Sequence, residues 1–138
     1  MTVLQAAAAV CVFAIAGIPP SVRAMEPSGD HLPELVSAGQ FPAAGHPYQV
    51  DFGRSKFRLA FTSDKEMTFT SLVDPTITET VKIAVTQLRS SLFMVAWTEK
   101  AGDRAHHVED FEHMVIYTNI ARKDGTFVHL KGPITELR

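Results

Sequence analysis

The chain has 138 residues, of which 46% are hydrophobic and 20% charged, and its formal net charge is -2. This balance is that of a soluble globular protein with one domain and one core. Because the chain has no basic run, it lacks the electrostatic footprint of a nucleic-acid-binding protein, and no nucleic acid is expected as a partner.

Residues 1–24 have the composition of a secretory signal peptide. Residues 3–18 are apolar except for Gln5, and a Pro-Pro pair follows them. This run is shorter than the roughly 20 residues that a membrane-spanning helix needs. We therefore predict a signal helix that is cleaved on export, leaving a periplasmic or secreted protein with no stable membrane insertion. An uncleaved anchor is the alternative, because no Lys or Arg precedes the apolar run.

Residues 25–50 differ from the segments on either side of them. They contain four prolines and three glycines, which cannot support a long helix or a central strand. We predict an irregular N-terminal arm here, and a folded domain over residues 51–138.

The predicted domain is all-β. Short runs rich in β-branched and aromatic residues recur with turn residues between them, and no convincing helical period follows Asp51. The predicted strands are Lys56–Phe61, Met67–Ser71, Thr80–Leu88, Leu92–Glu99, Ala105–Phe111, Met114–Ile120 and Phe127–Lys131. We expect them to form an antiparallel up-and-down β-barrel of about 7–8 strands, since closure removes exposed sheet edges and leaves an interior for side chains or one small ligand.

Turn lengths predict which side chains face that interior. A four-residue loop at Lys100–Asp103 would place Trp97 opposite His106, and a turn at Glu112–His113 would place Val115 opposite Asp110. The predicted ligand-binding residues are Phe93, Val95, Trp97, Glu99, His106, Val108, Asp110, Tyr117, Asn119, His129 and Lys131.

Two alternatives to this assignment stay open. A shorter turn before Phe127 would bring in Val128 and Leu130 instead of His129 and Lys131. The opposite face, with Met94 and Ile116, is also apolar. Either the arm or a second subunit covers it, or the two faces are reversed, because a slip of one residue exchanges them.

The stretch HHVEDFEHMVIYTN, residues 106–119, is rich in metal-ligand types. His106 and His107 are neighbours on a strand and point to opposite faces. A metal site usually needs three converging ligands, so we predict no metal or other cofactor and interpret His107 and Glu109 as a solvated polar pair. Cleavage of the signal would also remove Cys11, the only cysteine.

Catalysis is less favoured than binding. The sequence has no GxSxG motif or other nucleophile arrangement, and we assign no catalytic residue. The enzymatic alternative is acid–base chemistry by His106 with Glu99 or Asp110.

The run from Arg89 to Thr135 resembles the lipocalin-like domain of molybdenum cofactor biosynthesis protein F, the MoaF-like domain. The resemblance lies in Trp97-Thr98-Glu99, His107 to Phe111, Tyr117-Thr118-Asn119, and Asp124 to Phe127 followed by Lys131-Gly132. It implies a calycin-type barrel that binds a small, partly apolar molecule. Phenolic acid decarboxylases share the broad calycin shape, which makes a lyase or decarboxylase the enzymatic alternative. A homodimer that associates through the Met94/Ile116 face is a third hypothesis.

Overall fold

The computed structural model describes residues 41–138. The predicted signal helix and the first part of the predicted arm lie outside the described residues. Within them there is no helix, and so none that is long and apolar enough to cross a membrane. The prediction of an all-β domain is confirmed.

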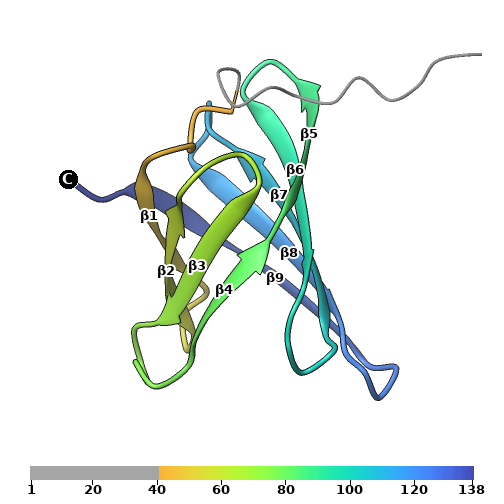
Figure 1. Cartoon of the computed structure of the whole chain (residues 1–138). Coiled ribbons are helices and arrows are strands. Elements are labelled where there is room, and N and C mark those ends of the chain that lie inside the picture. Colours follow the sequence, from red (N-terminus) through yellow and green to blue (C-terminus); the bar gives the residue numbers. More distant parts are fainter. Residues whose placement is uncertain (1–40) are drawn as a thin grey trace, which may run out of the picture. The chain divides into compact units, whose positions relative to one another are not determined.

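Nine antiparallel strands follow one another along residues 41–138 (Figure 1). They are β1 (Pro47–Asp51), β2 (Lys56–Phe61), β3 (Glu66–Ser71), β4 (Thr78–Lys82), β5 (Ala84–Arg89), β6 (Leu92–Thr98), β7 (Arg104–Asp110), β8 (Val115–Ala121) and β9 (Phe127–Glu136). The strand order in the sheet is β4-β3-β2-β1-β9-β8-β7-β6-β5. The described residues thus form more strands than the 7–8 that the sequence predicts, for two reasons.

The first reason is β1, which lies mostly inside the predicted irregular arm. This strand pairs with β2 on one side and with β9 on the other, so it is central despite beginning at Pro47. The strand tolerates that proline because Pro47 is its first residue, and it accepts a hydrogen bond from Leu137 through its carbonyl. The sequence predicts that the barrel begins at Asp51, but it begins earlier, with β1.

The second reason is a break in the predicted strand Thr80–Leu88. Ile83 interrupts it and donates its N–H to the carbonyl of Lys65 at 2.9 Å. The segment before Ile83 pairs with β3 and the segment after it pairs with β6. One length of chain therefore joins the two edges of the sheet and makes a nearly closed barrel.

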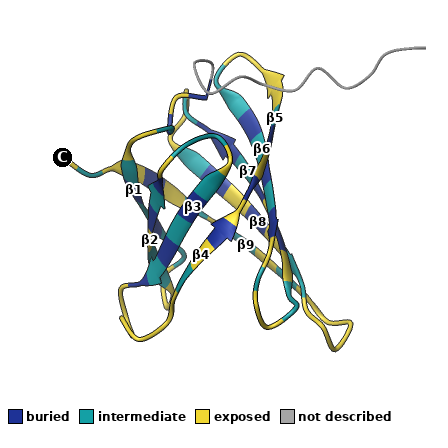
Figure 2. Cartoon of the chain, viewed as in Figure 1, coloured by how far each residue is buried: buried dark blue, intermediate teal, exposed yellow. Residues whose placement is uncertain are grey.

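Buried and exposed side chains alternate along most strands (Figure 2). The buried apolar side chains form one core cluster inside the barrel. Phe41 packs edge-on against Phe61, Phe93 and Phe111, with ring centroids 5.2 to 6.1 Å apart. These contacts fill the end of the barrel where β2 and β7 finish and β6 begins. The cavity described below lies toward the other end.

Candidate ligand-binding cavity

The barrel holds a small, partly enclosed cavity toward the end where the β1–β2 and β6–β7 turns lie. The volume of this cavity is about 60 Å³. Its wall is mostly apolar, with polar groups supplied by Glu99, His107 and Thr118. The apolar lining residues and Trp97 come from strands on both sides of the barrel: Val50, Phe52, Phe57, Leu59, Phe69, Trp97, Ile120 and Leu130.

Two polar atoms at this cavity have no hydrogen-bond partner within the described residues. They are Nε1 of Trp97 and Oγ1 of Thr118, and both residues are more than nine-tenths buried. A buried polar group without a partner costs on the order of 1–3 kcal/mol. An apolar cavity with a few unpaired polar groups is the arrangement that binds and orients a small molecule.

A buried His–Glu pair stands beside these atoms. Nδ1 of His107 lies 3.3 Å from Oε1 of Glu109, and His107 is 4% exposed and Glu109 0% exposed. The ring of His107 meets the indole of Trp97 edge-on at 4.5 Å. Burial raises the pKa of the Glu109 carboxyl, and its hydrogen bond with His107 opposes that rise. Because Nδ1 is engaged by Glu109, Nε2 is the ring nitrogen left for a ligand.

Glu99 completes the polar side of the cavity. Burial raises the pKa of this carboxyl, the neighbouring carboxylates of Asp103 and Glu79 raise it further, and the indole N–H of Trp97 lowers it. The carboxylate is therefore close to that N–H, although the two make no hydrogen bond of ordinary geometry. Trp97 and Glu99 also line an open groove between β4 and β6, at the seam of the sheet.

The structure divides the residues predicted from the sequence into two groups. Phe93, Val95 and Trp97 are buried inside the barrel, and Trp97 and Glu99 line the cavity. The prediction that the remaining predicted ligand-binding residues also face the barrel interior and line its cavity is wrong. Those placed elsewhere are His106, Val108, Asp110, Tyr117, Asn119, His129 and Lys131.

Several of these residues still meet one another, but on the outer surface of the barrel. Asn119 lies opposite His129 and bonds its ring Nδ1 at 2.5 Å. Lys131 lies opposite Tyr117, with Nζ 5.3 Å from the ring centroid. Tyr117 is 43% exposed. The cross-strand pairs between β8 and β9 that a longer turn before Phe127 predicts are thus present. These pairs lie on the outer face of the barrel and not on the inner face.

The turn between β6 and β7 explains the exchange of faces. The N–H of Glu99 donates to the carbonyl of Asp103 at 2.8 Å, which leaves a three-residue loop. Trp97 therefore pairs with Ala105 and not with His106. The predicted register between β7 and β8, with Asp110 opposite Val115, is confirmed. A single residue at one turn thus reversed both strands.

The same reversal overturns two further interpretations. His107 and Glu109 are a buried pair that faces the interior, not a solvated one. Ile116 is 0% exposed, so it does not share an outer face with Met94, and a homodimer stays a prediction.

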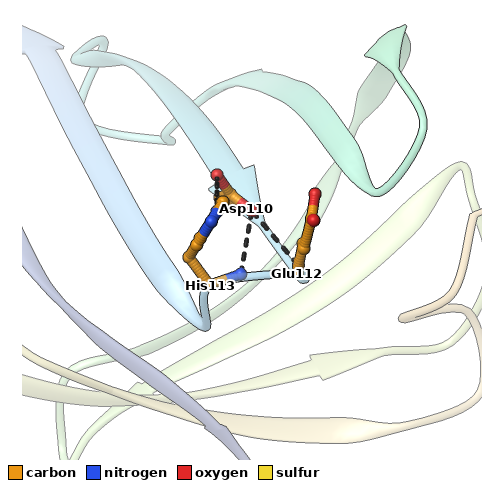
Figure 3. Close-up of side chains that lie close together, drawn as sticks. All are labelled: Asp110, Glu112 and His113. Atoms are coloured by element: carbon orange, nitrogen blue, oxygen red, sulfur yellow. Dashed lines mark hydrogen bonds and ion pairs between the residues drawn. The ribbon is translucent and has the colours of Figure 1, made fainter.

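The ligand-type groups of the β7–β8 turn come together at the surface. Ligand atoms of Asp110, Glu112 and His113 all lie within 4.8 Å of one another (Figure 3). Asp110 accepts the backbone N–H groups of Glu112 and His113 and bonds Nδ1 of His113 at 2.9 Å. The guanidinium of Arg89 lies 3.4 Å from Asp110 and 3.3 Å from Glu112. These groups satisfy one another, which is the geometry of a capped turn.

The fold and the cavity define a class, the small antiparallel β-barrels that enclose an interior site. The MoaF-like family model matches residues 44–135, and the chain belongs to the MoaF-like family. Among curated proteins none matches. A solved structure from Burkholderia vietnamiensis, described as a "putative beta-lactamase", is 20% identical, with a TM-score of 0.64 over 70% of this chain and 96% of that one. At this identity the likeness concerns the fold alone.

Proposed function

We propose that this protein is an exported member of its family that binds a small, partly apolar molecule in the interior of the barrel. Export follows from the signal-like composition of residues 1–24. Binding rests above all on one observation, that the Trp97 N–H and the Thr118 hydroxyl have no hydrogen-bond partner within the described residues at a mostly apolar cavity. A ligand that accepts or donates hydrogen bonds there would offset the cost of leaving these groups unpaired.

The ligand is small. A cavity of about 60 Å³ holds several waters at most, because one water needs roughly 10–15 Å³. Molecules of a few heavy atoms fit it without rearrangement. Larger ones need the seam between β4 and β6 to open, where the two strands contact each other only weakly.

Trp97 is the single tryptophan of the chain, so its fluorescence reports on the cavity. A panel of small, partly apolar compounds is titrated against the full chain, with binding also followed by calorimetry. We expect binders to shift the emission, and Thr118→Val, which keeps the side-chain shape, to weaken them roughly 3- to 10-fold through one lost hydrogen bond. Thr135→Val, at an exposed position of β9, serves as the matched control. No shift from any compound, or calorimetric binding unchanged in Trp97→Phe, would count against an interior site.

The His107–Glu109 pair favours acid–base catalysis as a second candidate. A buried carboxyl that engages one ring nitrogen orients the other toward the cavity, which is how enzymes position a general base. If a bound compound is turned over, His107→Gln should abolish turnover while retaining binding. Equal turnover in this variant would exclude the pair from the chemistry.

A further inference from the structure

The apolar wall of the cavity is unusually aromatic. Phe52, Phe57, Phe69 and Trp97 all line it, and they come from the β1–β2 turn, β2, β3 and β6. The ring centroids of Phe57 and Phe69 are 6.4 Å apart, as are those of Phe69 and Trp97. Aromatic faces carry the negative part of a ring quadrupole and attract cations that have left water.

The charge at the cavity is also negative. Glu99 lines it, and no Lys or Arg is found among the lining residues of the described chain. Glu79 is held nearby, because its Oε1 accepts the backbone N–H of Lys100 at 2.7 Å. The neighbouring Lys82 is engaged elsewhere, with Nζ 2.6 Å from Glu66. Within the described residues, the lysines beside Glu99 are Lys82 and Lys100 of the adjoining groove, and neither lines the cavity itself.

Two further groups suit the same kind of ligand. The unpaired hydroxyl of Thr118 can accept a hydrogen bond, and Nε2 of His107 can accept another when Nδ1 donates to Glu109. An ammonium group carries donors and no acceptor. Acceptors on Glu99, His107 and Thr118 beside aromatic rings are thus complementary to it. The Trp97 N–H is a donor, and Glu99 is the acceptor close to it.

We infer that the ligand of this cavity is a small organic cation, an alkylammonium ion of a few heavy atoms. Its charge lies between Glu99 and the aromatic rings, and its hydrocarbon part lies among the phenylalanines. This inference rests on the proposed function, since it names the class of molecule that the same cavity binds.

Three probes of one shape separate charge from hydrophobicity: butylammonium, butan-1-ol and butanoate. Each is titrated calorimetrically into the full chain at pH 8. The alkylammonium is still protonated at this pH, and Glu99, whose pKa is raised, is more fully ionised than at lower pH. We expect butylammonium to bind at least about tenfold more tightly than butan-1-ol, from one carboxylate contact and one or more cation–π contacts. Butanoate should bind most weakly of the three.

Two isosteric variants locate the preference. Glu99→Gln should reduce the advantage of butylammonium over butan-1-ol to less than about threefold. Glu112→Gln, which removes an exposed carboxylate at the other end of the barrel, should retain it. Thermal unfolding confirms that both variants are folded.

The outcomes distinguish the two proposals. If butan-1-ol binds as tightly as butylammonium, or if Glu99→Gln keeps the full preference, the cation assignment is overturned while interior binding stands. If none of the three probes binds and the wider fluorescence panel also fails, both proposals fall.

Discussion

Glu109 shows how one residue can be structurally costly and still fit a binding site. Its side chain is completely buried, Oε1 bonds His107, and Oε2 has no partner within the described residues. An apolar pair of similar volume would often serve stability equally well or better. Polar groups that break the local rules of a core are expected where a protein binds or reacts.

The pH dependence of stability should report on Glu109. Its pKa is raised in the folded protein by burial, so the folded state holds the proton over a pH range in which the unfolded chain has lost it. The stability linked to this group is therefore fully present below the ordinary pKa of 4.5 and is lost as the pH rises through the folded value.

We expect urea denaturation of the wild type to give a free energy of unfolding that decreases from pH 5 to pH 8 relative to Glu109→Gln, which cannot ionise. Glu112→Gln should follow the wild type, because Glu112 is exposed. Parallel pH profiles for the wild type and Glu109→Gln would show that Glu109 titrates normally.

At the scale of elements, the strands themselves were largely predictable. The limits of β2 were predicted correctly, and those of β3, β6, β7 and β8 to within one residue at each end, because β-branched and aromatic runs between turn residues carry a strong local signal. The missed strand, β1, contains a proline and follows a Pro/Gly-rich segment, and its place in the sheet depends on distant pairing with β9. Such non-local contacts leave no local pattern.

The faces of β7 and β8 were not predictable by alternation alone. Along β7, the inward set has Ala105, His107 and Glu109, and the outward set has His106 and Val108. Neither set is clearly the more apolar, so turn length alone decided the assignment. Gly102 was the available signal, since a glycine in that position is typical of a three-residue hairpin loop with a G1 bulge. His107, Glu109 and Thr118 were missed as site residues for this reason.

Substitution of Gly102 tests that turn. Its φ is +98°, a region that costs an L-residue with a Cβ roughly 1–2 kcal/mol. A Cβ would also meet the Lys123 side chain at 3.3 Å. We expect Gly102→Ala to lower the free energy of unfolding by about that amount, measured by urea denaturation, and Gly102→Asn to lose less, because Asn tolerates this conformation better. No loss in Gly102→Ala would contradict the turn geometry.

At the scale of the whole molecule, closure depends on the pairing of β1 with β9. Only three residue pairs join these strands. Gly132 on β9 lies against the β1–β2 corner, where an added Cβ would overlap the carbonyl oxygen of Asp51. The backbone must yield to accept any side chain there.

We therefore expect Gly132→Ala to destabilise the barrel by roughly 2–3 kcal/mol through overpacking, measured by thermal or urea unfolding. Thr135→Ala, at an exposed position of the same strand, should change stability by less than about 0.5 kcal/mol. A Gly132→Ala protein as stable as the wild type would show that Gly132 does not approach the Asp51 carbonyl this closely.

The central claim, an interior site at Trp97, is tested most directly by nuclear magnetic resonance of the ¹³C,¹⁵N-labelled full chain during titration with a compound that binds it. Trp97 supplies the single indole N–H resonance of the chain, and that N–H is buried and has no partner among residues 41–138. We predict that ligand shifts this resonance together with the Thr118 methyl, while the ring of His129 on the outer surface does not respond. A saturable shift at His129 and Tyr117 with the indole resonance unmoved would contradict the account.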